Sequence, residues 1–360
     1  MSETVGGRAL RVMQVIDNIG AGGAQQVVVD LCNWLALQHG VVVSIVAEPG
    51  SSRARLDPSV RFIPQRSAGF LTQTRALLLA ARAQKPDILH AHQRREALQS
   101  LVVGRLLGIP VVEHAHTRLP SVRPRILSFR SRTVFAVGDR VADMVVYDAR
   151  RPRSRVVVVG NAPAQRAASR PGEWPATDPA APLRILAVGR LVEQKDPLRF
   201  VRVVARVAQS MPVAATWAGD GELRGEAERL AAELGAPVEF AGHVDDVPDR
   251  LDAAHVLVMT SRWEGTPLVV LEAFERRRPV VATTSAANGL LGSGRGFEVA
   301  DDADDGEFAR AITHVVTDDR ARTAAISRAK SWVDAEASPE RVFGPVLERY
   351  RAVVALSGGS

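Results

Sequence analysis

The sequence predicts an α/β protein made of two doubly wound parallel-sheet domains in tandem. First, the chain has 360 residues, more than one ordinary domain needs and enough for two cores. Second, short β-branched apolar runs alternate with segments of helical periodicity along both halves. Third, the strands of the second half stop at Gly, Ser or Thr, which leaves space for a ligand at the carboxyl edge of the sheet.

The first half predicts one such domain at residues 1–165. Its strands are predicted at 9–16, 41–46, 87–90, 109–114, 134–137 and 156–159. Apolar residues at helical spacing predict a helix after the first strand and further helices at 71–83 and near 94–107. Strand, loop, helix and strand in this order form a right-handed crossover between parallel strands.

The second half repeats this pattern after a linker at 166–182, which carries four prolines and little apolar content. Its strands are predicted at 184–188, 214–218, 238–242, 256–260 and 279–283, within a domain at 183–337. The segment 338–360 is predicted to form a helix that packs back on the first domain. Two such sheets are expected to face each other across a ligand-binding cleft between the domains.

Composition excludes several classes of protein. A hydrophobic fraction of 46% and a charged fraction of 24% are those of a folded globular chain. The net charge is only +6, and since 43 of the 46 basic residues are arginine, we attribute the pI of 10.3 to arginine bias and expect no nucleic-acid partner. The sequence shows no signal peptide and a single cysteine, Cys32, which predicts a cytoplasmic location.

The strongest chemical pattern is Glu264-Gly-Thr-Pro-Leu-Val-Val-Leu-Glu272, which follows the strand at 256–260. Pro267 is predicted to begin the first helical turn, a position that suits proline. The N–H groups of Leu268 and Val269 would then be free to bind a phosphate, and Glu272 could accept hydrogen bonds from sugar hydroxyls. The alternative is a surface loop and helix with ordinary acidic residues.

Two cations follow the strand at 184–188, in the segment Gly189-Arg190-Leu-Val-Glu-Gln-Lys195. Arg190 offers a bidentate guanidinium and Lys195 a compact ammonium, so both can reach one diphosphate. Lysine occurs only three times in the chain, which makes Lys195 the more informative of the two. The alternative is a solvated loop.

Two patterns in the first half remain open. Gly20-Ala-Gly-Gly-Ala24 is not a dinucleotide fingerprint, because Gln25 occupies the third glycine position, and it serves either a ligand or the turn alone. The pairs His90/His92 and His114/His116 end two strands, each pair on one face. They are metal ligands, core or edge histidines, or substrate contacts; we expect no metal, because no acidic ligand accompanies them.

With these motifs, nearly the whole chain resembles the retaining GT-B glycosyltransferases of the GT4 family. The family signature is a glutamate, seven residues and a second glutamate, matched by Glu264 and Glu272. The resemblance implies that Glu264 contacts the donor sugar and Glu272 the ribose. The family's usual glycine after this helix is replaced within Phe274-Glu-Arg-Arg-Arg278, a departure that we expect on the back of the helix, away from both glutamates.

The resemblance also assigns roles to the loops. It places the first glycine-rich loop near the donor phosphate, the main chain near His243 on the nucleobase, and His116 beside the donor sugar. The implied catalytic residues are His116, Arg190, Lys195 and Glu264. The implied donor-binding residues are Gly22, Gly23, Gly189, Gly219, His243, Val244, Gly265, Thr266, Leu268, Val269 and Glu272. The implied acceptor-side residues are Asp17 and His92.

The implied activity is transfer of a hexose-type sugar from a nucleotide diphosphate donor, UDP in preference to GDP, to a hydroxyl acceptor with retention. A front-face mechanism needs no metal and no cofactor. Sugars, lipid-linked sugars and small molecules are all candidate acceptors. An NDP-sugar 2-epimerase of the same fold and a non-catalytic sugar-nucleotide-binding protein are the alternatives.

Arginine is concentrated at 118–132, where Arg118, Arg123, Arg125, Arg130 and Arg132 alternate with apolar residues. Such a segment either lies on an anionic membrane surface or forms a solvated helix. For a cytoplasmic protein, that surface would be the inner face of the membrane.

Overall fold

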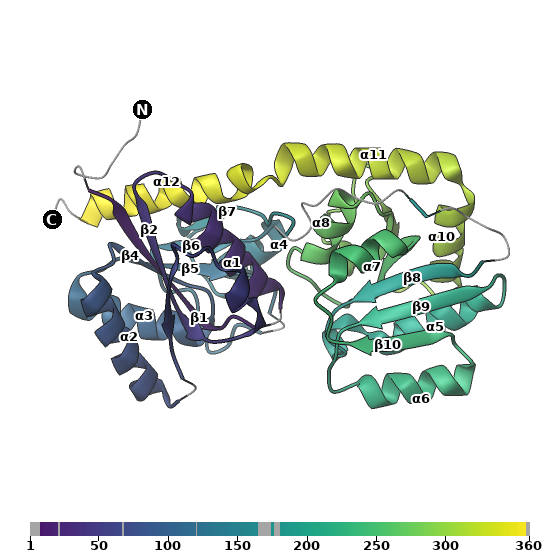
Figure 1. Cartoon of the computed structure of the whole chain (residues 1–360), viewed down its shortest axis with the longest axis horizontal. Coiled ribbons are helices and arrows are strands. Elements are labelled where there is room, and N and C mark those ends of the chain that lie inside the picture. Colours follow the sequence, from purple (N-terminus) through teal and green to yellow (C-terminus); the bar gives the residue numbers. More distant parts are fainter. Residues whose placement is uncertain are drawn as a thin grey trace. The chain divides into compact units, whose positions relative to one another are not determined.

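The computed structural model of the chain describes residues 8–20, 22–66, 68–119, 121–164, 174–175 and 181–357 (Figure 1). The chain divides into two compact units: unit 1 is Met1–Ala162 with Ser338–Ser360, and unit 2 is Pro163–Ala337. Most of the linker predicted at 166–182 lies outside the described residues. Among the residues that are described, no helix is long and apolar enough to cross a membrane.

Unit 1 contains a seven-stranded parallel sheet with the order β3-β2-β1-β4-β5-β6-β7. Its strands are β1 (Leu10–Asn18), β2 (Val41–Glu48), β3 (Arg61–Pro64), β4 (Ile88–Ala91), β5 (Val111–Ala115), β6 (Thr133–Ala136) and β7 (Val156–Val158). Its helices are α1 (Gly23–Ala36), α2 (Phe70–Gln84), α3 (Arg94–Leu107), α4 (Asp139–Asp143) and α12 (Pro339–Ser357). The strand order reverses between β1 and β4, where α/β sheets bind ligands.

Helices cover both faces of this sheet, as a doubly wound fold requires. On one face, Leu77 of α2 and Val103 of α3 pack in the same buried cluster as Met13 of β1. On the other face α1 packs beside α12, with the rings of Trp34 and Phe343 5.9 Å apart. The C-terminal helix α12 is therefore part of the core of unit 1 (Figure 1).

Unit 2 contains a six-stranded parallel sheet with the order β10-β9-β8-β11-β12-β13. Its strands are β8 (Leu183–Val188), β9 (Val213–Ala218), β10 (Val238–Gly242), β11 (Val256–Met259), β12 (Val280–Thr283) and β13 (Phe297–Val299). Its helices are α5 (Pro197–Ala208), α6 (Arg224–Leu234), α7 (Val247–Ala253), α8 (Leu268–Glu275), α9 (Thr284–Ala287), α10 (Asp305–Thr317) and α11 (Asp319–Glu336). Here the order reverses between β8 and β11.

The predicted class, two Rossmann-like parallel-sheet domains, is confirmed. The short strands β3 (Arg-Phe-Ile-Pro) and β13 (Phe-Glu-Val) were not predicted, because a charged residue or a proline interrupts them, whereas the equally short β7 is an unbroken run of valines. The arginine-rich segment 118–132 is not the helix that one alternative required. Its described residues, 118–119 and 121–132, form a loop with a 3-10 turn at Arg125–Leu127, and Pro124 before that turn disfavours a longer helix.

We expected the arginines near the end of α8 to lie on the back of the helix. Instead they follow its last residue, Glu275. Arg276 and Arg278 are buried and bind Asp252, with Arg276 Nε 2.9 Å from Asp252 Oδ1. Arg277 is exposed and adopts a φ of 56°, in the left-handed region. The N–H of Arg278 bonds to the carbonyl of Ala273 and that of Arg277 to Phe274, a Schellman motif with arginine at the position glycine usually takes.

Candidate functional site

The predicted donor-side residues of unit 2 lie on loops that follow four adjacent strands, β10, β9, β8 and β11. Backbone hydrogen bonds join these loops. The N–H of Gly189 donates to Ala218 (3.0 Å), and that of Gly219 donates to Gly242 (2.7 Å). The N–H of Arg262, after β11, donates to Gln194 (2.8 Å). The loops thus line one edge of the sheet, on both sides of the β8/β11 reversal.

Glycine is required where two of these loops touch. Gly219 has a φ of 142°, and a Cβ on it would lie 2.0 Å from the carbonyl oxygen of Gly189. That carbonyl also accepts a hydrogen bond from the indole N–H of Trp217, at 2.8 Å. Any side chain at 219 would push the Gly189–Arg190 loop out of place.

Lys195 and Glu264 form an ion pair at this edge. Lys195 ends a short 3-10 helix, Glu193–Lys195, and its Nζ lies 2.5 Å from Oε1 of the buried Glu264. Gln194 holds the same loop, because its amide donates to the carbonyl of Trp263 (3.0 Å) and lies 3.5 Å from Glu264 Oε2. By contrast, the exposed guanidinium of Arg190 has no hydrogen bond or ion pair with any described residue.

The start of α8 differs slightly from the prediction. Pro267 is the N-cap, with φ −68° and ψ 116°, and Leu268 is the first helical residue. The N–H groups of Leu268 and Val269 find no acceptor in the described part of the chain, as the first turn of a helix leaves them. Glu272 is buried on the same helix, 1% exposed.

The remaining donor-side positions frame this edge. Gly265 and Thr266 connect Glu264 to α8, and the side chain of Asn288 donates to the carbonyl of Gly265. His243 and Val244 follow β10; His243 is exposed, with Nε2 3.4 Å from Asp245 Oδ1. The structure therefore brings every donor-side residue predicted in unit 2 to the carboxyl edge of one sheet.

In unit 1, Asp17 lies near the carboxyl end of β1, and His92 and His116 follow the neighbouring strands β4 and β5. Asp17 Oδ1 accepts a hydrogen bond from the amide of Gln93, at 2.9 Å, which joins two of these strand ends. Gly22 is the N-cap of α1 with a φ of 150°, and Gly23 is its first residue. These residues lie at the β1/β4 reversal of the sheet.

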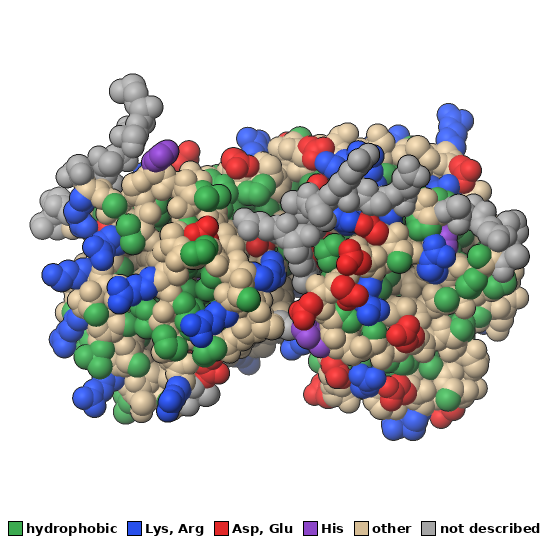
Figure 2. Space-filling view, in the orientation of Figure 1, with side chains coloured by type: hydrophobic (Ala, Val, Ile, Leu, Met, Phe, Trp, Pro, Cys, Tyr) green, Lys and Arg blue, Asp and Glu red, His purple; other side chains and the backbone are tan. Residues whose placement is uncertain are grey.

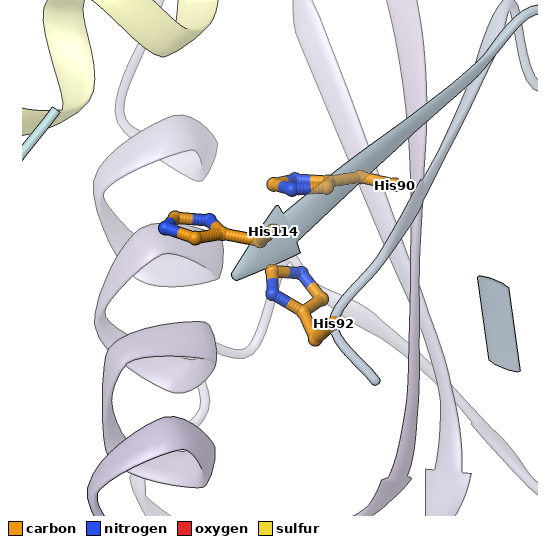
Figure 3. A group of neighbouring side chains, drawn as sticks. All are labelled: His90, His92 and His114. Atoms are coloured by element: carbon orange, nitrogen blue, oxygen red, sulfur yellow. The ribbon is translucent and has the colours of Figure 1, made fainter. Parts of the chain in front are cut away.

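The four histidines form one cluster in unit 1. Ring centroids are 4.1 Å apart for His90 and His92, 4.2 Å for His114 and His116, and 5.3 Å for His90 and His114. Figure 3 shows three of these rings gathered together. Burial is the main cause that lowers the pKa of each imidazole, to about 3 for His116, so all four are neutral at pH 7.

A chain of hydrogen bonds leads from α12 to His116. Tyr350 Oη accepts from the amide of Gln14 (3.2 Å), whose oxygen accepts from His92 Nε2 (2.6 Å). His92 Nδ1 therefore has no proton and accepts from His116 Nε2, at 2.9 Å. Tyr350 in turn donates to His90 Nδ1, at 2.5 Å. With this assignment of Gln14, His116 carries its proton on Nε2 and keeps a lone pair on Nδ1.

Three of these histidines could serve as metal ligands. Nitrogen atoms of His90, His92 and His114 lie within 4.8 Å of one another. Nitrogens on one tetrahedral zinc ion lie about 3.3 Å apart, so binding would draw the rings inward. Both ring nitrogens of His114 and Nε2 of His90 are buried without a hydrogen-bond partner among the described atoms.

Sequence reasoning missed the residues that hold the predicted ones. Gln14 left a signal, since it is polar in the middle of the run Val-Met-Gln-Val-Ile, which is otherwise apolar. Tyr350 lies 336 residues away from its partner Gln14, a distance over which local pattern says nothing. Gln194 is an ordinary loop residue in the sequence, and only its contacts with Trp263 and Glu264 reveal it.

Comparison with known families decides the identity. Residues 21–162 match the family described as "Glycosyltransferase Family 4", and residues 182–318 match "Glycosyl transferases group 1". The chain belongs to the GT4 family of glycosyltransferases. Together the two matches include the donor-side loops of unit 2 and the histidine cluster of unit 1.

Similar proteins come from bacterial glycoconjugate synthesis. This GT4 chain is 29% identical to the lipopolysaccharide core biosynthesis glycosyltransferase LpsE of Rhizobium meliloti, over 91% of the chain and 95% of LpsE. It is 25% identical to a Campylobacter jejuni N-acetylgalactosaminyltransferase named for a diphosphoundecaprenol-linked acceptor, over 89% and 93%. The structure of Anabaena HepE with UDP-glucose matches with a TM-score of 0.78 at 17% identity, over 95% and 100%.

Proposed function

We propose that this glycosyltransferase moves a hexose-type sugar from a nucleotide diphosphate donor, UDP in preference to GDP, to a hydroxyl of a lipid-linked saccharide, with retention of configuration and without a metal. The observation that carries the donor half is the pairing of Lys195 with Glu264 beside the unpaired guanidinium of Arg190. The names of the LpsE and Campylobacter relatives support the acceptor half.

Charge decides how the donor would bind. With Lys195 neutralised by Glu264, Arg190 offers a positive charge that no described residue pairs with, and the diphosphate would bind to it in a bidentate manner. The N–H groups of Leu268 and Val269, at the positive end of α8, provide further donors. As the diphosphate approaches, Lys195 would turn toward it, which frees Glu264 to accept a hydrogen bond from a hydroxyl of the donor sugar.

These groups act on the departing diphosphate. The bond from the anomeric carbon to the phosphate oxygen breaks while a bond to the acceptor oxygen forms on the same face. The acceptor's proton passes to the oxygen of the departing phosphate. Arg190, Lys195 and the α8 N–H groups stabilise the negative charge that accumulates there, the role for which fixed donors are most effective. Residues 17, 92 and 116 of unit 1 are the proposed acceptor and sugar contacts.

The two glutamates would have separable roles, and this separation provides the test. Glu272→Gln should weaken binding of UDP measured by calorimetry, because the ribose is present in that ligand. Glu264→Gln should leave UDP affinity nearly unchanged but reduce transfer, because the sugar that it contacts is absent from UDP. Equal loss of UDP affinity in both variants would contradict the assignment of roles.

Substitution of Lys195 and Arg190 tests their proposed contacts with the diphosphate, and substitution of another lysine and another arginine of unit 2 provides the controls. Lys195→Ala and Arg190→Ala should each lower transfer by roughly a hundredfold, as removal of one oxyanion donor does. Lys330→Ala removes another ion-paired lysine, and Arg310→Ala another exposed arginine, without touching the proposed site. Turnover within threefold of wild type in both Lys195→Ala and Arg190→Ala would exclude these residues from the mechanism.

The acceptor dependence of the products separates the rival activities. Release of UDP only when an acceptor is present indicates transfer, whereas interconversion of two UDP-sugars indicates a 2-epimerase. Binding of the donor with neither reaction would indicate a non-catalytic binding protein. A thermal-shift screen of nucleotide sugars selects the donor for these assays, since a ligand bound only by the folded state raises the apparent Tm.

A further inference from the structure

One region of unit 1 combines exposed apolar side chains with a large excess of arginine. The segments 65–82, 93–102 and 117–132 contain ten arginines and one carboxylate, Glu96, which is buried. Large apolar side chains are exposed on the same segments; they are Phe70, Leu71, Leu79, Val102, Ile126 and Leu127. Figure 2 shows basic and apolar surface intermingled over the part of unit 1 where Figure 1 labels α2 and α3.

Hydrogen bonds join these three segments into one surface. Arg95 donates to the carbonyl of Ala68, which joins the start of α3 to the loop before α2. Arg94 donates to the carbonyls of Arg123 and Pro124, both at 3.0 Å, which joins the start of α3 to the arginine-rich loop. The helices α2 and α3 also pack side by side. We call this the α2–α3 surface.

The position of the α2–α3 surface relative to the carboxyl edge of the sheet matters for function. The helices α2 and α3 follow β3 and β4, so their first turns lie at the carboxyl edge of the sheet. The loop with Ile126 starts at that edge after β5, and its residues Arg123 and Pro124 accept hydrogen bonds from Arg94 at the start of α3. His92 and His116 also follow β4 and β5. Leu71, which is 81% exposed in the first turn of α2, therefore lies at the same edge as the proposed acceptor contacts, and Ile126, 68% exposed, lies on the loop that leaves this edge after β5.

We propose that the α2–α3 surface binds an anionic lipid bilayer and so presents the acceptor-side edge of unit 1 to a lipid-linked substrate. This inference rests on the proposed function and names the surface where the acceptor arrives. Charge complementarity selects the partner, because arginines without exposed carboxylates attract anionic headgroups while Leu71 and Ile126 enter the acyl boundary. On α2, Leu71, Arg75, Leu79 and Arg82 recur at helical spacing on one stripe, as in interfacial helices.

Co-sedimentation of the full chain with vesicles tests the surface directly. The protein should bind vesicles of equal parts phosphatidylglycerol and phosphatidylcholine, and bind pure phosphatidylcholine far more weakly. Binding should fall as salt rises, because screening shortens the reach of the arginines. Arg75→Glu with Arg82→Glu should weaken binding by at least 25-fold, about fivefold for each arginine lost. Leu71→Ser with Ile126→Ser should weaken it on the order of tenfold per side chain.

Matched controls lie away from the α2–α3 surface. Leu37 is 70% exposed at the end of α1, at the opposite edge of the same sheet, so Leu37→Ser should bind as wild type does. Arg310→Glu in unit 2 controls for net charge. Failure of the wild type to bind anionic vesicles, or equal loss in the controls, would overturn the proposal. An interaction with another protein through the α2–α3 surface would then be the alternative.

A second readout separates this inference from the proposed activity. Transfer to an acceptor with a short, water-soluble lipid, assayed without membranes, should be unchanged in both pairs of variants. Loss of transfer there would mean that the surface shapes the site itself, which contradicts a purely membrane role. If the wild type binds vesicles but transfers no sugar, the proposed function is wrong, while the proposal that the α2–α3 surface binds a bilayer is still supported.

Discussion

The buried histidine cluster predicts that unit 1 loses stability as the pH falls below about 6.5. Each of the four imidazoles has a pKa lowered by burial, so the unfolded chain binds protons that the native unit does not. The stabilisation is therefore complete above the ordinary histidine pKa of about 6.5 and is lost as the pH falls, for His116 down to about 3.

The size of this effect follows from the proton count. Each extra proton bound by the unfolded state contributes about 1.4 kcal/mol per pH unit. Burial raises the pKa of Glu96 and of Glu113, so the native state releases their protons at a higher pH than the unfolded chain does, which opposes the effect of the histidines. Four histidines against two carboxyls leave a difference of two to four protons, a slope of about 3–6 kcal/mol per pH unit. At the larger slope, a domain stable by roughly 5–15 kcal/mol should unfold within about one to three units below pH 6.5.

His114→Phe isolates one member of the cluster. His114 packs beside Phe135, with ring centroids 5.8 Å apart, and both of its nitrogens lack a hydrogen-bond partner among the described atoms. The substitution should reduce the slope by one proton, about 1.4 kcal/mol per pH unit. It should also raise the free energy of unfolding at pH 7 by about 1–2 kcal/mol, because an unsatisfied buried polar group is removed.

Urea unfolding between pH 5 and about 7.5 measures this effect in unit 1 alone if it is followed by pulsed hydrogen exchange of peptides from β4 and β5. His39→Gln, at an exposed histidine of the same unit, is the control and should leave the slope unchanged. Parallel stability curves for wild type and His114→Phe would refute the argument, because they would mean that His114 binds its proton equally in both states.

Three further predictions concern other parts of the chain. Arg277→Gly should raise the Tm of unit 2 by about 2–4 °C, since a left-handed φ of 56° costs a non-glycine residue about 1 kcal/mol net; Arg277→Ala should give no such gain in calorimetry. Transfer should continue in excess EDTA, and full inactivation restored by zinc would instead assign a metal to His90, His92 and His114. Tyr350→Phe should lower the stability of unit 1 by about 1–3 kcal/mol in the same urea assay, because Gln14 and His90 lose a buried partner; an unchanged stability would show that the hydroxyl is not needed.

The sequence predicted those parts of the fold in which local pattern and structure coincide. Five of the six strands of unit 2 were predicted because each is largely apolar and ends at a small residue, and such an ending marks the carboxyl edge where loops reach a ligand. Arg190, Lys195 and Glu264 could be found for the same reason, since each lies on a loop directly after a strand. The ion pair between Lys195 and Glu264 could not, because it joins loops 69 residues apart in the chain.

Long-range packing accounts for the rest. The histidine pairs were visible as strand-end residues, but their stacking depends on β4 and β5 being neighbours in the sheet order. The partner of His90 is Tyr350, on a helix that follows the whole of unit 2 in sequence. The surface around 118–132 was visible as arginine and apolar residues, yet its continuation onto α2 and α3 depends on Arg94 and Arg95.

The arginine that replaces a glycine after α8 shows how a departure from a family pattern can leave a site intact. The hydrogen bonds from Arg277 and Arg278 to the last turn hold the backbone in the left-handed turn that glycine would adopt more readily. The buried pairing of Arg276 and Arg278 with Asp252 fixes both sides of that turn to α7. The strain at Arg277 is thus offset at the carboxyl end of α8, and the N–H groups of Leu268 and Val269 keep their place at the other end. A sequence pattern specifies a conformation, and a different residue satisfies it when its neighbours supply the missing stability.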